Sequence, residues 1–342
     1  MINRLLGGSD VFIIAEVGQN HQGDPDLALR YVREFANIGA NAIKFQTRNN
    51  RALFAGEVYA KPYDSENAFA ETYGSHREAL ELPLDFLGNL RAECKKFNVS
   101  FMSTPFDEQS LEVLLALDVD IIKIASFDLG NLPFIKKIGL ADRPTVLSVG
   151  GGNIDQIKAS VQLLNSLCSE VAVLHCVSEY PCSHNRLGLN QIEKLIEMFP
   201  TNVIGLSDHF NGIISGPIAY MKGARIFEKH VTFDRAWKGT DHSFALSPDG
   251  FRRFARDIRR VPEMLIEKDV SEVGREQVFT KLGKSLVPKV DLRFGDLLTI
   301  DNLTGKIFNK TYIPVRKSFE VIGRILKVDV QAGVPLDWSQ FE

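Results

Sequence analysis

The chain has 342 residues, of which 44% are hydrophobic and 24% are charged, a balance that is typical of a folded globular protein and excludes wholesale disorder. Lysine and arginine number 40 and aspartate and glutamate number 43, so the formal net charge is −3. A near-neutral chain argues against nucleic acid or an anionic membrane as a partner, and we expect small-molecule ligands instead.

Short apolar or β-branched runs alternate with longer amphipathic stretches along most of the chain. The runs are nearly continuous in hydrophobicity, as expected of parallel strands that are buried on both faces. We predict strands at Phe12–Val17, Ala42–Gln46, Ser100–Thr104, Ile121–Ala125, Thr145–Val149, Val171–Val177, Val203–Ser207 and Ile226–Val231. We predict helices at Asp26–Ile38, Leu84–Phe97, Gln109–Leu117, Leu132–Ile138, Ile154–Ser166, Leu189–Phe199 and Ile213–Lys222. Eight such repeats indicate a (β/α)₈ TIM barrel, an α/β fold, with a doubly wound open sheet as the alternative.

Polar residues at the ends of the eight runs favour the closed barrel. An open sheet gathers its polar groups at one or two switch points, whereas a barrel enzyme spreads them around the rim where its strands end. Here every run ends in polar or charged residues: Glu16; Lys44 and Gln46; Ser103 and Thr104; Lys123 and Ser126; Ser148; Ser178; Asp208 and His209; Glu228 and His230.

Composition divides the chain into a barrel over residues 1–268, a linker over 269–280 and a small strand-rich domain over 281–342. The last barrel helix is expected within Phe251–Glu267. In the small domain, the segments Val290–Asn302 and Val328–Gln340 have weakly similar sequences. A domain of about 60 residues has a marginal core of its own. The segment Arg48–Leu82 is a long insertion after the second strand, and we interpret it as a lid, an interface arm or a passive surface excursion.

The cysteines and the first residues suggest a location. Cys94, Cys168, Cys176 and Cys182 show no CxxC spacing, so we interpret them as free thiols in a reducing compartment. The segment Met1–Ile14 is too short and too polar for a signal peptide, and no later stretch is apolar enough to cross a bilayer. We therefore expect a cytoplasmic protein.

Two histidines end adjacent predicted strands and are candidate metal ligands. His209 follows the seventh strand and His230 ends the eighth. Two imidazoles at matching heights on neighbouring strands are able to hold one divalent ion, with oxygen ligands in the open positions. This donor set suits Mn²⁺, with Mg²⁺, Co²⁺ or Fe²⁺ as alternatives.

Two lysines inside apolar strands indicate an anion site. Lys44 and Lys123 each require a carboxylate or a bound anion, because burying an unpaired charge is costly. Hydroxyl groups at neighbouring strand ends and the glycine run 150–152 would add hydrogen-bond donors for a phosphate or a carboxylate. A Schiff-base lysine of the aldolase kind is the alternative. Among the acidic residues, Glu16 and Asp241 are placed to bind sugar hydroxyls or to move protons, with a loop cap as the alternative for Asp241.

Motifs along nearly the whole chain resemble one known family, the sialic acid synthases, which are nonulosonate synthases that condense phosphoenolpyruvate (PEP) with an amino sugar. The matching stretches are Ala15–Gly23, Lys44–Thr47, Ser103–Asp107, Lys123–Ser126, His175–Pro181, Gly205–His209, Glu228–Thr232 and Gly239–His242, with Gly283–Val287 and Val321–Arg324 in the tail. The resemblance implies a TIM barrel followed by a small β-rich antifreeze-like (SAF) domain.

The resemblance also implies the roles of individual residues. It implies a PEP-binding set of Lys44, Lys123, Ser126, Ser148, Ser178 and Ser207. It implies a sugar-binding set of Glu16, Gln46, Thr104, Phe106, Tyr180 and Asp241. His209 and His230 match metal ligands, and together with Glu16 they are the expected catalytic residues.

The activity implied is metal-assisted condensation of PEP with an N-acylmannosamine-like aldose to a nine-carbon 2-keto-3-deoxy sugar acid, with release of phosphate by C–O cleavage. A domain-swapped homodimer is implied as well, in which the small domain caps the partner's barrel. Two other classes of function stay open: a metal-dependent or Schiff-base sugar-acid aldolase, and a non-catalytic carbohydrate-binding protein.

Two single positions and one short stretch depart from the family pattern. Ser178 stands where the family often has an asparagine that binds PEP, and Val149–Gly152 replaces a Thr-Gly-Met sequence. Ile307 stands where family members usually place an arginine that reaches the sugar's N-acyl group in the partner subunit. We therefore expect the acceptor sugar, or its acyl group, to differ from N-acetylmannosamine.

Overall fold

The computed structural model describes residues 10–341, so the first nine residues of the predicted barrel domain and of the segment Met1–Ile14, and residue 342, lie outside the described residues. The chain divides into two compact units, Met1–Leu265 and Ile266–Glu342, and each is described by itself. No helix within residues 10–341 is long and apolar enough to span a membrane.

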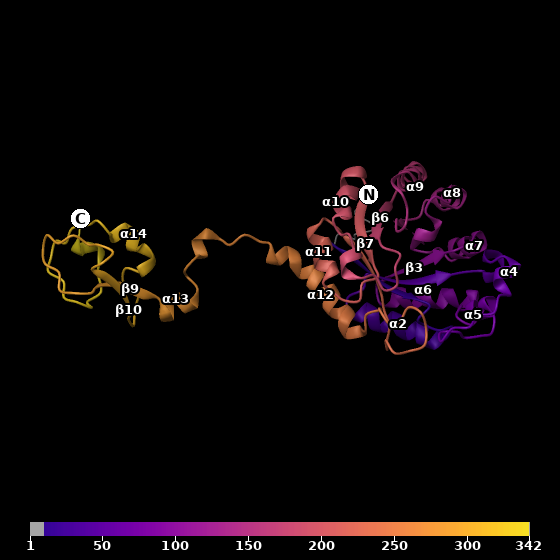
Figure 1. The fold of residues 1–342 in the computed structure, drawn as a ribbon, viewed down its shortest axis with the longest axis horizontal. Coiled ribbons are helices and arrows are strands. Elements are labelled where there is room, and N and C mark those ends of the chain that lie inside the picture. Colours follow the sequence, from indigo (N-terminus) through magenta and orange to yellow (C-terminus); the bar gives the residue numbers. More distant parts are fainter. Residues whose placement is uncertain (1–9, 342) are drawn as a thin grey trace. The chain divides into compact units, whose positions relative to one another are not determined.

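The first unit is built on a closed barrel of eight parallel strands (Figure 1). The barrel closes because β1 pairs with β2 on one side and with β8 on the other. The predicted TIM barrel is confirmed, and the alternative of an open sheet is wrong. The strands are β1 Phe12–Gly18, β2 Ala42–Thr47, β3 Ser100–Pro105, β4 Ile121–Ile124, β5 Thr145–Ser148, β6 Val171–Cys176, β7 Val203–Asp208 and β8 Ile226–His230.

Helices alternate with these strands. The longer ones are α2 Pro25–Asn37, α6 Leu87–Lys96, α7 Glu108–Ala116, α8 Leu132–Leu140, α9 Ile154–Leu167, α10 Gln191–Met198, α11 Ser215–Met221 and α12 Pro248–Met264. Local sequence explains where several begin. The Asp24 side chain accepts hydrogen bonds from the first backbone N–H groups of α2, and Pro25 opens that helix with a backbone angle already suited to it. Ser247 and Pro248 act in the same way at α12.

Successive side chains of each strand belong to two different apolar layers, which explains why the strands are hydrophobic along their whole length. One set of side chains packs outward against the helices, for example Ile13, Ile43 and Phe227. The other set fills the barrel interior near the strand starts: Phe12, Ile14, Ala42, Met102, Ile121, Val146, Ala172, Leu174, Val203 and Ile226. Because successive side chains point to opposite faces, the next inward positions along each strand lie above this interior layer.

The second unit has a small core around an antiparallel pair, β9 Lys284–Pro288 and β10 Leu303–Ile307. Two short helices, α13 Gln277–Leu282 and α14 Ser318–Val321, belong to it. The two segments with similar sequences, Val290–Asn302 and Val328–Gln340, meet where Leu292 pairs with Val330 in an isolated antiparallel bridge. The buried core side chains are Leu286, Leu292, Leu298, Leu303, Ile313, Val321, Leu326, Val330, Leu336 and Phe341. This β-rich unit is consistent with the expected SAF domain.

A fully buried ion pair joins the outer faces of β7 and β8. Lys229 Nζ lies 2.6 Å from Asp208 Oδ2, and neither side chain is exposed to solvent. Ser215 of α11 donates a 2.5 Å hydrogen bond to the same carboxylate oxygen. The pair therefore links the sheet to a surrounding helix, and each charge depends on the other because neither side chain is exposed to solvent.

We predict that Lys229→Met destabilises the fold by about 3–5 kcal/mol, because it leaves the Asp208 carboxylate buried without its cation. The double variant Asp208→Asn/Lys229→Met should recover part of this loss. The matched control is Arg252→Met, which removes an ion pair of the same 2.6 Å length that lies half-exposed on α12. Urea unfolding followed by circular dichroism measures all three, and equal midpoints for Lys229→Met and Arg252→Met would contradict the prediction.

Candidate active site

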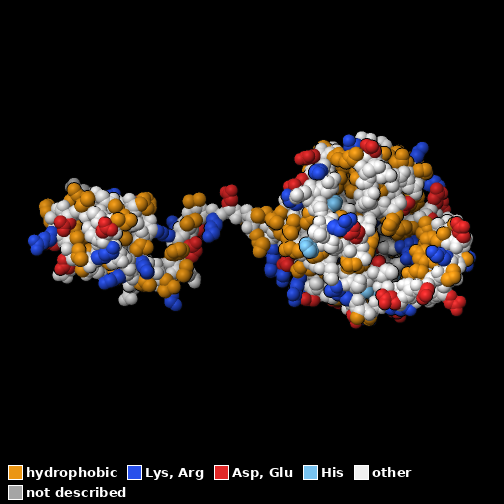
Figure 2. All heavy atoms as spheres, in the orientation of Figure 1, with side chains coloured by type: hydrophobic (Ala, Val, Ile, Leu, Met, Phe, Trp, Pro, Cys, Tyr) orange, Lys and Arg blue, Asp and Glu red, His pale blue; other side chains and the backbone are white. Residues whose placement is uncertain are grey.

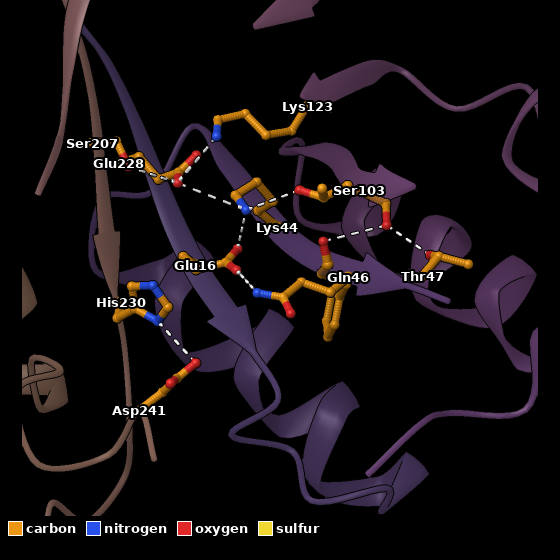
Figure 3. Close-up of polar contacts among 12 residues, drawn as sticks. Glu16, Lys44, Gln46, Thr47, Ser103, Lys123, Ser207, Glu228, His230 and Asp241 are labelled. Atoms are coloured by element: carbon orange, nitrogen blue, oxygen red, sulfur yellow. Dashed lines mark hydrogen bonds and ion pairs between the residues drawn. The ribbon is translucent and has the colours of Figure 1, made fainter. Parts of the chain in front are cut away.

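Inward-pointing polar side chains line the barrel at the level where the strands end. Below them the same inward positions hold the apolar interior layer, for example Ile14 beneath Glu16 and Ala42 beneath Lys44. Figure 3 shows Glu16 of β1, Lys44 of β2 and Lys123 of β4 converging with Glu228 and His230, which both come from β8. The other inward-pointing polar side chains at this level are Gln46, Thr104, Ser148 and Ser207. Alternation along each strand therefore brings chemistry to one end of the barrel and packing to the other.

Two lysines and two glutamates form a buried cluster at the centre of this site. Lys44 Nζ lies 2.7 Å from Glu16 Oε2 and 3.7 Å from Glu228 Oε1, and Lys123 Nζ also lies 3.7 Å from Glu228 Oε1 (Figure 3). Ser207 donates a 3.1 Å hydrogen bond to the same Glu228 oxygen. Each of the four charged side chains is at most 5% exposed. Glu228 thus balances both cations that the sequence indicated.

The cluster shifts the pKa values of its two carboxyl groups in opposite directions. Burial, and after it the charge of Glu228, raises the pKa of Glu16 to about 7, although Lys44 acts against this shift. Burial also acts to raise the pKa of Glu228, but the charges of Lys123 and Lys44 outweigh it and hold that pKa at about 2. Glu16 is therefore the group able to take up and release a proton near neutral pH, while Glu228 stays ionised.

The two lysines also differ. Burial acts to lower the pKa of Lys44, but Glu16 and Glu228 outweigh burial and raise it above its usual range. Lys123 has the more distant carboxylate, so burial keeps its pKa below the usual range, and the neighbouring charge of Lys44 adds to this effect.

Serine hydroxyls at the ends of β4 to β6 are able to form further hydrogen bonds. Among the side chains that the structure describes, Ser148 Oγ and Ser178 Oγ are buried and have no hydrogen-bond partner. The backbone N–H of Gly150 donates a 3.0 Å hydrogen bond to Ser126 Oγ. A Cβ at Gly150 would lie 2.5 Å from Ser178 Oγ, so only glycine leaves these hydroxyls their space. Buried hydroxyls without partners are suited to a bound anion.

Three of the predicted sugar-binding residues lie around one glycine. A Cβ built on Gly18 would approach Glu16 Oε1 at 3.3 Å and Asp241 Oδ2 and Gln46 Nε2 at 3.4 Å. Gln46 also donates a 2.8 Å hydrogen bond to Glu16. Thr104 accepts a 3.3 Å hydrogen bond from Lys44. These four residues therefore share one polar region.

Phe106 and Tyr180 lie at the edges of this region. The Phe106 ring packs under the Arg48 guanidinium at 4.2 Å, so its face is already covered by a cation. Tyr180 is 44% exposed, and its ring centroid lies 4.0 Å from that of His209. Ile307 belongs to β10 of the second unit and is 52% exposed there.

The two candidate metal ligands are neighbours. The ring centroids of His209 and His230 are 5.4 Å apart. His209 Nδ1 contacts the carbonyl oxygen of Val177 at 2.8 Å, which orients the ring and leaves Nε2 free for a ligand. His230 Nδ1 lies 3.7 Å from Asp241 Oδ2 and has no hydrogen-bond partner within residues 10–341.

This donor set fits a divalent cation in an open site. Burial lowers the pKa of His230, so its ring is neutral near pH 7, the form that binds a metal. No cluster of three or more His, Cys, Asp or Glu side chains within residues 10–341 forms a ready metal cage. A cation here would be held by the two imidazoles and by oxygen ligands from substrate or water.

Sequence reasoning assigned no role to several groups of this site. Glu228 was recognised as a polar strand end, and its inward position two residues before His230 was the available signal. Cys176, whose pKa is lowered by His209 and Lys123 against the effect of burial, occupies the corresponding inward position on β6. Arg48 and Arg77 come from the insertion, where no periodic pattern marks which side chains face the barrel.

Taken together, the fold and site define a TIM barrel with a buried cluster of two lysines and two glutamates beside a pair of neighbouring histidines. A profile of the NeuB family matches residues 31–269. The chain is 34% identical over 330 residues to N-acetylneuraminate-9-phosphate synthase of Homo sapiens, covering 96% of this chain and 92% of that protein. It is 34% identical to N,N'-diacetyllegionaminic acid synthase of Campylobacter jejuni, covering 86% and 89% of the two chains.

A solved structure agrees with these relatives. The crystal structure of N-acetylneuraminic acid (sialic acid) synthetase from Leptospira borgpetersenii superposes with a TM-score of 0.68 at 32% identity, covering 80% of this chain and 93% of that chain. The chain belongs to the NeuB family, and the family expected from the sequence motifs is confirmed.

We predict that Lys44→Met raises the pKa of the Glu16 carboxyl above about 7, because Lys44 supplies the largest charge that opposes the effect of burial. Carboxyl resonances of protein labelled with ¹³C at glutamate Cδ report this pKa, and a Glu16→Gln spectrum identifies the signal. Lys222→Met, which removes the partner of Glu193 at the surface, is the control and should leave it unchanged. A Glu16 pKa near 4.5 in the unmodified protein would contradict the arrangement of charges.

Proposed function

We propose that this protein condenses PEP with an N-acylmannosamine-like aldose to give a nine-carbon 2-keto-3-deoxy sugar acid and inorganic phosphate. The observation that carries this proposal is the buried pair Lys44 and Lys123 beside hydroxyls without partners, next to two neighbouring histidines. The names of the relatives, which are synthases of sialic and legionaminic acids, support the same reaction class. The enzyme would be a PEP-dependent transferase that forms a carbon–carbon bond.

PEP carries a phosphate and a carboxylate, and the pocket offers matching groups. Lys44 and Lys123 would oppose its negative charge. The side chains of Ser126, Ser148, Ser178 and Ser207 and the backbone N–H groups of the glycine run would donate hydrogen bonds to it, Ser207 in place of its bond to Glu228 and Gly150 in place of its bond to Ser126. Glu228 pairs with both lysines while PEP is absent, and this pairing limits the cost of burying two cations before the substrate arrives.

The reaction balances with one water molecule. C3 of PEP forms a bond to the aldehyde carbon of the sugar, whose oxygen takes a proton and becomes a hydroxyl. Water adds to C2 of the former PEP, and the tetrahedral centre then expels phosphate by breaking its C–O bond. Glu16, with a pKa of about 7, is the group placed to hold or move a proton beside the sugar. Gln46, Thr104, Phe106, Tyr180 and Asp241 would complete the sugar site.

His209 and His230 would hold a divalent cation, for which Mn²⁺ is our first choice and Mg²⁺ or Co²⁺ are alternatives. When bound, such an ion supplies a Lewis acid for the aldehyde oxygen. The chain's own contribution is to lower the pKa of His230 by burial and to orient the His209 ring through Val177.

A Schiff-base aldolase is the second candidate, because one observation favours it. Lys123 has a lowered pKa and lies near the second cation Lys44, which is the environment that activates a lysine nucleophile. Borohydride trapping of pyruvate on Lys123 would support this reading. The third candidate, a carbohydrate-binding protein, would bind sugar without consuming PEP.

The second unit is proposed to cap the barrel of a partner chain in a cytoplasmic homodimer. Large apolar side chains are exposed on it, including Phe294 at 73%, Ile300 at 73% and Phe319 at 76%, and such side chains are visible on its surface in Figure 2. A small unit with this much exposed apolar surface is suited to a protein interface.

The assay that tests the proposed function measures phosphate released from PEP, with products weighed by mass spectrometry. We expect release to require both an amino sugar and a divalent cation, to stop on chelation and to return with Mn²⁺. His209→Ala and His230→Ala should each lower kcat by about 100-fold or more, because the Lewis acid is lost. His184→Ala, which changes an exposed histidine, is the control. Full activity of both variants after chelation would refute the metal site.

We also predict that Ile307→Arg shifts the sugar preference toward N-acetylmannosamine by about tenfold in relative kcat/KM, because an arginine there would supply a charged hydrogen-bond donor for the acyl oxygen. A panel of sugars differing in the N-acyl group measures the ratio. Unchanged relative kcat/KM values across the panel would count against the role of this position.

A further inference from the structure

The insertion at residues 48–82 contacts the barrel mouth at several points. Its short helices are α3 Asn50–Leu53, α4 Gly56–Tyr59 and α5 Tyr73–Glu78. Asn67 accepts a 2.9 Å hydrogen bond from the backbone N–H of Gly239 in the loop after β8. Arg77 donates a 2.8 Å hydrogen bond to Gln19 in the loop after β1. The insertion therefore contacts the mouth from two sides and is not a passive surface excursion.

A buried ion pair joins the two ends of the insertion. Arg48 Nη1, at its start, lies 2.9 Å from Glu81 Oε1, near its end, and the two side chains are 6% and 14% exposed. The Arg48 guanidinium packs over the Phe106 ring at 4.2 Å, and its Nη2 donates a hydrogen bond to Gln46 Oε1. One face and two edges of the guanidinium are thus each held by a different group, so Arg48 has little freedom to turn.

Gln46 links Arg48 to Glu16. Its amide oxygen accepts the hydrogen bond from Arg48, and its amide nitrogen donates a 2.8 Å hydrogen bond to Glu16 Oε1 (Figure 3). A guanidinium has only donors. If the amide were turned over, its NH₂ group would face the Arg48 donors and its oxygen would face the Glu16 carboxyl group. Arg48 therefore allows one orientation of the Gln46 amide, and it anchors the end of the amide that Glu16 does not hold.

The anchored amide has one N–H left for a ligand. Gln46 Nε2 carries two hydrogens, and Glu16 accepts one of them. Gln46 Nε2 and Asp241 Oδ2 each lie 3.4 Å from the position that a Cβ on Gly18 would occupy, and Glu16 Oε1 lies 3.3 Å from it. This small space is thus bordered by one N–H donor and by two carboxyl groups.

We propose that Arg48 is a positioning residue for acceptor recognition, which fixes the Gln46 amide so that the sugar meets its N–H beside the carboxyl groups of Glu16 and Asp241. The inference rests on the proposed function and adds a residue that acts through Gln46 and does not itself touch the sugar. An oxygen acceptor of the sugar then lies opposite Gln46, and hydroxyl donors of the sugar face the two carboxyl groups.

Arg48→Met tests the proposal through the KM values of the two substrates, with the sugar of the panel that has the highest kcat/KM as acceptor. We expect KM for the sugar to rise about tenfold, because the Gln46 amide loses one of its two anchors, and KM for PEP to change by less than about twofold. A general loss of structure would move both values. Arg48→Lys keeps one donor for Gln46, so KM for the sugar should rise only about threefold. This variant provides the test if Arg48→Met does not fold.

A double-mutant cycle shows whether Arg48 acts through Gln46. In a Gln46→Met background, Arg48→Met should raise KM for the sugar by less than about twofold further. Arg51→Met is the matched control, because Arg51 lies in the same insertion but is exposed and packs over Tyr59. It should leave both KM values unchanged. Equal rises in the KM values of sugar and PEP, or full additivity of the Arg48 and Gln46 substitutions, would overturn the proposal.

A spectroscopic measurement separates failure of this inference from failure of the proposed function. In protein labelled with ¹⁵N at glutamine, relaxation of the Gln46 side-chain amide gives its order parameter without any substrate, and Gln46→Met identifies the signal. We expect the value of a rigid group, about 0.85, and a fall below about 0.6 in Arg48→Met. If this fall occurs but no sugar causes PEP to be consumed, the proposed function fails while the anchoring of Gln46 by Arg48 is supported. An equally rigid amide in Arg48→Met refutes the positioning role, even if PEP is consumed.

Discussion

The site depends on four ionisable side chains buried together where the apolar filling of the barrel ends. Lys44 and Lys123 are held in the interior by Glu16 and Glu228, and each charge needs its neighbours because each side chain is at most 5% exposed. The same arrangement sets the chemistry. Glu228 stays ionised between two cations, and Glu16 is left with a pKa of about 7.

Around this cluster, each region of the mouth contributes one kind of group. The ends of β4 to β6 and the turns that follow them supply hydroxyls and close backbone approach at Gly150. The ends of β7 and β8 supply two neighbouring imidazoles, and the fully buried Asp208–Lys229 pair lies behind them on the outer faces of the same strands. The insertion supplies arginines on the side of Gln46 and Asp241. The groups that we propose for anion, metal and acceptor binding are thus distributed around one rim, as is usual for this fold.

Much of this site was predictable because strand periodicity is a local property. The alternation that buries Ile14 also turns Glu16 inward, and the same holds for Ala42 and Lys44, so the sequence indicated which strand ends carry chemistry. Glu228 lies on the same inward face, but its role depends on two lysines from other strands. The insertion has no comparable period, so nothing in its sequence distinguished a half-buried arginine such as Arg77 from an exposed one such as Arg51.

The sequence by itself determined the eight-strand barrel, the strand ends that bear polar groups and the family, because these follow from periodic patterns and from motifs read along one segment at a time. Only the tertiary structure decided which charges meet. Coulomb interactions and desolvation act between residues that are distant in the chain, such as Lys44 and Glu228 or Arg77 and Gln19. The way these residues meet sets the pKa of Glu16, and it leaves Arg77 without an ion-pair partner among the described residues. Neither property follows from the sequence of any single segment.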